Sequence, residues 1–202
     1  MALAVERNWP ADKKLFGIAL TRYGHALTLE RIRWVEAGHP VPDEAGEQAA
    51  REMLGAARAI KPMDMLLALI SGGGSALLSL PAEGVSIIDL RAVTRDLLRS
   101  GATIQEINTV RKHLSQIQGG RLAAACKAPV RALIVSDVTG DDPTHIASGP
   151  CAPDPTTFQD AVDVLNRFDV KPPRAVLNHL IAGLRGERFA NRPQGAAVMQ
   201  FL

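Results

Sequence analysis

Apolar residues along the chain follow two spacings, and each spacing predicts a different kind of secondary structure. Short, nearly unbroken apolar runs predict strands at 15–20, 32–36, 65–70 and 132–136. Between and after these runs, apolar residues recur three and four positions apart, which predicts amphipathic helices. Strands that alternate with helices indicate the α/β class with a largely parallel sheet.

Capping residues mark where several of the predicted helices begin. Asp43 is a predicted N-cap of a helix that runs to about Ile60. Ser86 and Thr103 each precede a carboxylate by three positions, the spacing of a capping box. The second box predicts a helix that runs to Gly119. Helical spacing ends at residue 184, so we expect one α/β domain over residues 1–184 and an irregular tail over 185–202.

Composition excludes several classes of function. The chain has 202 residues, of which 47 % are hydrophobic and 22 % charged, as in ordinary globular proteins. A net charge of +2 and an aromatic content of 4 % argue against a nucleic-acid-binding protein. No run has the length of a membrane span, and because the first residues lack a basic region followed by an apolar core, we expect no secretory signal. The two cysteines form no metal-binding spacing, which favours a cytoplasmic protein.

The most distinctive stretch follows the apolar run at 65–70. It reads Ser71, Gly72, Gly73, Gly74, Ser75 and then turns into a helix-favouring Ala-Leu-Leu. Glycines at a strand-to-helix turn leave backbone N–H groups open to a ligand, so the stretch suits a phosphate or a carboxylate. Alternatively, it is only a tight strand-to-helix connection, since it is neither a P-loop nor a dinucleotide fingerprint.

A second polar cluster follows the apolar run at 132–136. Asp137 comes directly after this run, and Asp141 lies in the same loop. Ligands of open α/β sheets bind beyond the carboxyl ends of strands, so this loop and residues 71–75 can face one crevice. The carboxylates could hold Mg²⁺ or accept a proton from a substrate hydroxyl. The alternative is a solvated acidic turn.

A third cluster lies on the helix predicted after Thr103. Asn108, Arg111 and Lys112 are three and four positions apart and therefore share one helix face. Two cations and an amide could bind a carboxylate or a phosphate. The alternative is an ordinary solvated basic face.

Weaker candidates remain in the loops. Ser148 and Gly149, in Ile-Ala-Ser-Gly-Pro, could present backbone N–H groups to a ligand. His39 and His113 are single histidines, for which a satisfied structural role is the simpler interpretation.

Taken together, four motifs in this order resemble the glycerate 2-kinase family, whose bacterial members are often labelled hydroxypyruvate reductase. The resemblance covers about residues 1–184. The motifs are Ala37-Gly-His-Pro-Val-Pro-Asp43, Leu69-Ile-Ser-Gly-Gly-Gly-Ser-Ala-Leu-Leu78, Asn108-Thr-Val-Arg-Lys-His-Leu-Ser115 with Gly119-Gly-Arg-Leu122, and Ser136-Asp-Val-Thr-Gly-Asp-Asp-Pro143 with Ile146-Ala-Ser-Gly-Pro150.

The resemblance implies ATP-dependent phosphorylation of D-glycerate at its 2-hydroxyl, with Mg²⁺. It implies a Rossmann-like, mostly parallel sheet with flanking helices, part of the larger domain of a two-domain kinase. On physical grounds we assign residues 71–75 to the anion site, with Ser148 and Gly149 as further binding residues. Asn108, Arg111 and Lys112 would hold substrate or phosphate, and Asp137 and Asp141 would serve Mg²⁺ or the attacking hydroxyl.

The chain also departs from this family. Family members are about twice as long, carry a Gly-Lys step on a preceding helix, and have a second domain that supplies another basic catalytic residue. We therefore expect a truncated member whose kinase activity is impaired. Two alternatives stay open: a hydroxypyruvate reductase, for which no dinucleotide fingerprint is present, and a non-catalytic remnant that self-associates as a homo-oligomer.

Overall fold

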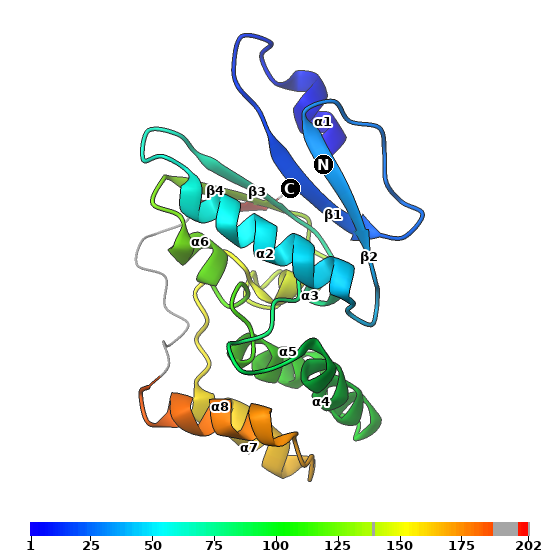
Figure 1. Cartoon of the computed structure of the whole chain (residues 1–202), viewed down its shortest axis with the longest axis vertical. Helices are drawn as coiled ribbons and strands as arrows, with labels where there is room; N and C mark the ends of the chain where they lie inside the picture. Colours follow the sequence, from blue (N-terminus) through cyan, green and yellow to red (C-terminus); the bar gives the residue numbers. More distant parts are fainter. Residues whose placement is uncertain (139, 188–197, 202) are drawn as a thin grey trace.

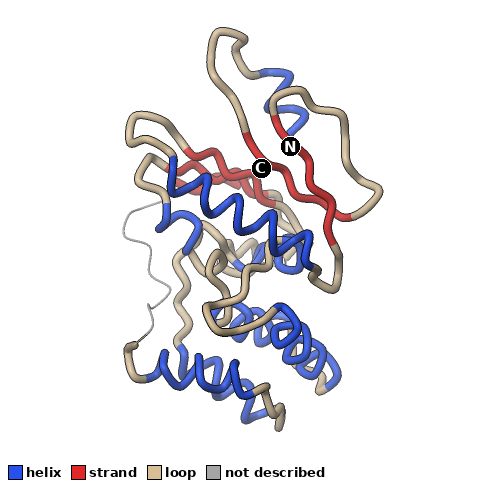
Figure 2. The backbone as a smooth tube through the Cα atoms, viewed as in Figure 1, coloured by secondary structure: helices blue, strands red, loops and turns tan. Residues whose placement is uncertain are grey.

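The structure is a computed structural model that describes residues 1–138, 140–187 and 198–201. Strands and helices are arranged as in Figures 1 and 2. The strands are β1 (Gly17–Arg22), β2 (Ile32–Ala37), β3 (Leu66–Ile70), β4 (Val130–Ile134) and β5 (Val198–Phe201). The helices are α1 (Ala2–Asn8), α2 (Glu44–Ala59), α3 (Gly74–Leu77), α4 (Ile87–Arg99), α5 (Ile104–His113), α6 (Arg121–Ala125), the 3-10 helix η1 (Ile146–Ser148), α7 (Phe158–Arg167) and α8 (Arg174–Leu184).

The strands form two parallel sheets. β1 pairs with β2 in one sheet, and the other has the order β3-β4-β5. Strands β3 and β4 pair with Leu66 opposite Val130 and Ile70 opposite Ile134, so their carboxyl ends lie level. The predicted α/β class with a parallel sheet and flanking helices is confirmed.

The part of the chain after α8 differs from the sequence prediction. We expected no strand in residues 185–202, yet Val198–Phe201 forms β5, which pairs with β4 from Arg131 opposite Val198. A strand of four residues is too short to produce a recognisable period in the sequence. Its pairing with β4, more than sixty residues earlier, defines it, and such a partner is invisible to local pattern analysis.

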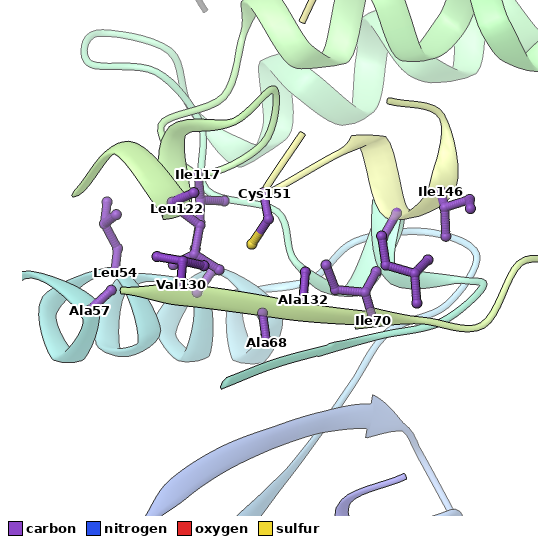
Figure 3. Close-up of a cluster of buried hydrophobic side chains, with 14 of the residues drawn as sticks. Leu54, Ala57, Ala68, Ile70, Ile117, Leu122, Val130, Ala132, Ile146 and Cys151 are labelled. Carbon is purple, nitrogen blue, oxygen red and sulfur yellow. The ribbon is translucent and has the colours of Figure 1, made fainter. Parts of the chain in front are cut away.

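Two apolar cores hold the structure together. The first joins α2 and α6 to strands β3 and β4, and Figure 3 shows its side chains. Alternate strand residues enter this core, including Ala68, Ile70, Ala132 and Ile134. This alternation follows from the two-residue period of a strand. The core fixes the ends of β3 and β4, from which the candidate site is built.

The second core lies among α4, α5, α7 and α8, which form a separate helical layer below the sheet in Figure 1. Val93, Leu97, Val110 and Leu180 are almost completely buried there. The capping boxes predicted for α4 and α5 are both formed, and Asp43 caps α2 through Gly46 as predicted.

Helix α5 is shorter than the sequence predicts, because it ends at His113 rather than near Gly119. Beyond that point the backbone pairs with the segment that follows α3. The N–H of Ala82 donates to the carbonyl of Leu114, and the N–H of Gln116 donates to the carbonyl of Leu80. The helical spacing of apolar residues continues through Ile117, which is fully buried. The sequence alone therefore could not reveal that α5 ends at His113.

Within the part of the chain that the structure describes, no helix is both long and apolar enough to cross a bilayer.

Candidate functional site

Three loops from separate parts of the chain meet at the end of β3. Residues 71–75, called the glycine turn below, follow β3 directly. Asp137 lies just beyond β4, whose end is level with that of β3. His39 lies in the loop between β2 and α2. The glycine turn is therefore the centre of the candidate site.

Side chains from the two other loops lie against the glycines of this turn. A Cβ atom at Gly72 would lie 1.8 Å from Oδ2 of Asp137. A Cβ atom at Gly73 would lie 3.1 Å from Nε2 of His39, and Gly73 has a φ of 80°, which glycine adopts without strain. In this arrangement the carboxylate and the imidazole occupy the space that a side chain would take at these two positions.

The end of the glycine turn contacts η1 and the segment after α5. The hydroxyl of Ser148 donates to that of Ser75 at 2.9 Å, and a Cβ atom at Gly74 would lie 2.6 Å from the Cβ of Ala147. The amide of Gln118 donates to the carbonyl of Ser75 at 2.9 Å. Ser75 and Ser148, two predicted binding residues, are thus in direct contact.

The η1 segment itself has an unusual backbone. Ala147, Ser148 and Gly149 are consecutive left-handed residues, with φ values of 52°, 58° and 59°. Non-glycine residues adopt this region only when their surroundings hold them there. Here the N–H of Gly119 donates to the carbonyl of Ser148 at 3.0 Å, and that of Gly120 to Gly149 at 2.7 Å. The structure therefore maintains a strained turn beside the glycine turn. The N–H groups of Ser148 and Gly149 donate within this turn, to the carbonyls of His145 and Ile146, so they are not open to a ligand as the sequence analysis expected.

The basic cluster of α5 points into the protein. Lys112 is fully buried, and its Nζ lies 2.7 Å from Oδ1 of Asp154, whose side chain is also fully buried. The same Oδ1 accepts hydrogen bonds from the N–H and the hydroxyl of Thr156. The alternative of a solvated basic face is therefore wrong for this helix.

Arg111 and Asn108 are also buried, at 8 % and 2 % relative exposure. Nε of Arg111 donates to the hydroxyl of Thr94 at 3.3 Å, and among the described residues Arg111 forms no ion pair. Burial lowers the pKa of Arg111 to about 10, so the guanidinium stays charged at neutral pH. Oδ1 of Asn108 is buried without a hydrogen-bond partner. Buried polar groups without partners are uncommon and mark positions where a ligand could supply the missing bond.

The acidic loop after β4 is open to solvent. Asp137 and Asp141 are exposed, and neither has a hydrogen-bond partner for its carboxylate among the described residues. Partial burial opposes ionisation of Asp142, but the N–H and hydroxyl of Thr144 and the charges of His145 and Lys112 lower its pKa. Lys112 therefore lies within electrostatic reach of this loop. Within the described residues, no three carboxylate, histidine or cysteine side chains form a metal cluster.

The comparisons with known proteins agree with this arrangement. A family model described as a domain of unknown function (DUF4147) matches residues 1–181. The chain belongs to this family. Among curated members, a glycerate 2-kinase from Pyrococcus horikoshii is 50 % identical over 173 residues. That match covers 85 % of this chain and 39 % of the relative.

Other family members resemble the chain to a similar degree. A D-glycerate 2-kinase from Thermotoga maritima is 46 % identical, over 79 % of this chain and 39 % of the relative. A protein from Agrobacterium vitis that carries a provisional hydroxypyruvate reductase label is 51 % identical, over 91 % of this chain and 42 % of the relative. The chain thus spans about two-fifths of the curated relatives it matches.

Solved structures show the same relationship. A crystal structure of a Pyrococcus horikoshii protein superposes with a TM-score of 0.86 at 41 % identity. The match covers 95 % of this chain and 50 % of that one. A glycerate kinase structure from Thermotoga maritima gives a TM-score of 0.80 at 34 % identity, covering 98 % of this chain and 53 % of that one. The resemblance seen in the sequence motifs is therefore confirmed.

Sequence reasoning missed three residues at or near the site. Asp154 was not singled out, because its partner Lys112 lies 42 positions earlier. Gln118 differs from the lysine common in the similar family, but nothing local in the sequence indicates that its amide reaches the carbonyl of Ser75. His39 was assigned a satisfied structural role, yet among the described residues its ring has no hydrogen-bond partner. For His113 that role is confirmed: it is buried, and its Nδ1 lies 2.9 Å from the carbonyl of Thr109.

Proposed function

We propose that this chain forms the glycine-turn part of a glycerate 2-kinase, which transfers a phosphoryl group from ATP to the 2-hydroxyl of D-glycerate. The observation that carries the proposal is the convergence of Asp137 and Ser148 on the glycine turn, in a chain 50 % identical to a glycerate 2-kinase. Phosphoryl transfer requires positioned anion-binding groups and a carboxylate near the attacking hydroxyl. This arrangement supports both requirements.

Each part of the site has a proposed role. The backbone N–H groups of Gly72, Gly73 and Gly74 bind phosphoryl oxygens, and the hydroxyls of Ser71 and Ser75 donate further hydrogen bonds. Ser148 supports this part of the turn from η1, because its hydroxyl donates to that of Ser75. Gly149 allows the left-handed backbone that places Ser148 there.

Asp137 is the proposed acceptor for the proton of the 2-hydroxyl. Its carboxylate is exposed and lies against Gly72, where a bound ligand would face it. Asp141 lies in the same loop and is also exposed. Carboxylate oxygens without protein partners fit Mg²⁺, which commonly takes only one or two protein carboxylates together with phosphate oxygens and water. Asp137 and Asp141 would hold the ion, which neutralises phosphate charge when bound.

The buried polar residues of α5 have two proposed roles, a positive potential at the site and a contact with the hydroxy acid. Lys112 acts through its field on Asp142. Arg111 carries a buried charge without an acidic partner among the described residues, and the unpaired Oδ1 of Asn108 could accept a hydrogen bond from a substrate hydroxyl. A guanidinium and a carbonyl one helical turn apart match the carboxylate and hydroxyl of a small hydroxy acid.

The test is direct detection of 2-phosphoglycerate after the chain is mixed with D-glycerate and Mg·ATP. We expect product at a reduced rate with the unmodified chain and a further large loss with Asp137→Asn, which keeps the shape but removes the basic oxygen. Asp163→Asn is the matched control, because Asp163 lies on the exposed side of α7, where its carboxylate binds Gln159. Equal product from the unmodified and Asp137→Asn chains would contradict the assignment.

The same samples test the reductase alternative. Oxidation of NADH in the presence of hydroxypyruvate would favour a reductase, whereas the proposal expects none. Light scattering of the chain alone tests self-association, and a dimer without any ligand response would favour the non-catalytic alternative.

A further inference from the structure

The loop that precedes α2 places the imidazole of His39 against the glycine turn. Of the atoms of His39, Nε2 comes nearest to the Cβ position of Gly73 at 3.1 Å, followed by Cδ2 at 3.3 Å and Cε1 at 3.9 Å. The ring therefore approaches the turn with its Nε2 edge. A ligand held by the N–H groups of the turn would lie within reach of this nitrogen.

The backbone around His39 is held in place by a carboxylate. Oδ2 of Asp43 accepts hydrogen bonds from the N–H of Gly38 at 2.9 Å and from the hydroxyl of Tyr23 at 2.7 Å. Its Oδ1 accepts from the N–H of Gly46 in the first turn of α2. The loop is also tight, since a Cβ atom at Gly38 would lie 2.5 Å from the carbonyl oxygen of Val41. His39 is thus presented from a preorganised loop.

The imidazole is available for a ligand. In the described part of the chain His39 forms no hydrogen bond and no ion pair, and it is exposed. Asp137 lies against the neighbouring Gly72, but no ion pair joins it to His39. The N–H groups of Gly72 and Gly73 donate no hydrogen bond to any described residue. A donor from the ring and two free backbone donors therefore lie at the same turn, close to a carboxylate.

We propose that His39 contacts the ligand at this site and donates a hydrogen bond from Nε2 to a phosphoryl oxygen bound at the glycine turn. The inference rests on the proposed function for the identity of the phosphoryl group, but not for the contact itself. An imidazole N–H adds a directional, charge-assisted bond to an anionic oxygen. Asp137 lies against the neighbouring Gly72, where the proposed function assigns it to Mg²⁺ or the attacking hydroxyl.

Phosphate binding tests the contact without any turnover. The ring signals of His39 are followed by ¹⁵N NMR of the full chain as inorganic phosphate, Mg·ADP or D-glycerate is added. We expect the His39 signals to shift with phosphate and Mg·ADP and to respond less to D-glycerate. His25 is an exposed histidine in the loop between β1 and β2, and its ring signals serve as the internal reference.

Variants add a quantitative measure. We expect His39→Asn to weaken phosphate binding by about tenfold, the usual effect of losing one charge-assisted hydrogen bond, and His25→Asn to leave it unchanged. Static His39 signals, or equal phosphate affinity of the unmodified and His39→Asn chains, would overturn the inference. The NMR result needs no variant, so a poorly folded His39→Asn chain leaves the test intact.

The two proposals can fail separately. If phosphate shifts His39 but no 2-phosphoglycerate forms, the proposed function of the chain fails and the contact stands. If product forms while His39→Asn keeps the full rate and KM, the contact fails and the function stands.

Discussion

Lys112 and Asp154 form an ion pair in which neither side chain reaches solvent. Nζ and Oδ1 lie 2.7 Å apart, and both side chains have zero exposure. Removing one member of a buried pair leaves the other charge without compensation, which costs far more than the pair itself contributes. The pair joins α5 to the segment before α7, so its loss would loosen the helical layer beneath the site.

The two members should not be equivalent. We expect Asp154→Asn to lower the free energy of unfolding by about 3–5 kcal/mol, because it leaves the buried ammonium of Lys112 unpaired. Lys112→Met should cost less, since Thr156 still donates two hydrogen bonds to Asp154. Urea unfolding measures both. The control is Asp96→Asn, which removes an exposed pair with Arg95 and should change stability by at most about 0.5 kcal/mol.

A methyl group at Gly72 should damage the site more than the fold. The new Cβ would lie 1.8 Å from Oδ2 of Asp137 and would push this carboxylate aside. A misplacement of about 1 Å in a positioned group can lower a reaction rate by about 100-fold. We therefore expect Gly72→Ala to reduce formation of 2-phosphoglycerate by about that factor.

Gly55 provides a matched glycine for this comparison. Gly55 is exposed and lies in the middle of α2, where no atom would come within 4 Å of an added Cβ. Gly55→Ala should stabilise the helix by up to about 1 kcal/mol and leave activity unchanged. Equal activity of the Gly72→Ala and Gly55→Ala chains would show that Asp137 does not need its present position.

Protonation of Asp43 should lower the stability of the folded chain in acid. Partial burial opposes its ionisation, but the N–H of Gly46, the hydroxyl of Tyr23, the N–H of Gly38 and the charge of Arg91 together lower its pKa. The folded state therefore binds this proton less readily than the unfolded chain. Its stabilisation is full above the ordinary value of 3.8 and is lost as the pH falls through the lower folded pKa.

The variant Asp43→Asn isolates this contribution. We expect the difference in unfolding free energy between the unmodified and Asp43→Asn chains to be largest near neutral pH and to shrink in acid. Urea unfolding at a series of pH values measures it. A difference that stays constant with pH would mean that ionisation of Asp43 contributes nothing to stability.

The two cysteines should react at very different rates. Burial, with a smaller effect of nearby Cys126, raises the pKa of Cys151 to about 12, so its thiol stays protonated. Cys151 is also 1 % exposed, whereas Cys126 is partly exposed at the end of α6. At mildly alkaline pH we expect a thiol reagent to modify only Cys126 in the folded chain.

Mass spectrometry of the labelled chain locates the modified thiol. Cys126→Ser should abolish the fast phase, and denaturant should expose Cys151. Rapid labelling of Cys151 in the folded Cys126→Ser chain would contradict its burial.

Local features of the sequence determined most of the fold. The capping boxes at Ser86 and Thr103 need only residues three positions apart, so they predicted the starts of α4 and α5 correctly. The apolar runs before residue 71 and before Asp137 predicted β3 and β4 within two residues at each end. Such signals are reliable because the hydrogen bonds and burial that produce them lie within one element.

Only the tertiary structure decided how these elements meet. Whether Lys112 faces solvent or the interior depends on Asp154, and β5 exists through its pairing with β4. The neighbours of Gly72 and Gly73 are Asp137 and His39, which come from loops far away in the chain. These contacts join residues whose separation exceeds any local period. Their stability comes from burial and geometry in the folded chain, and this is why the sequence could nominate the glycine turn but not its surroundings.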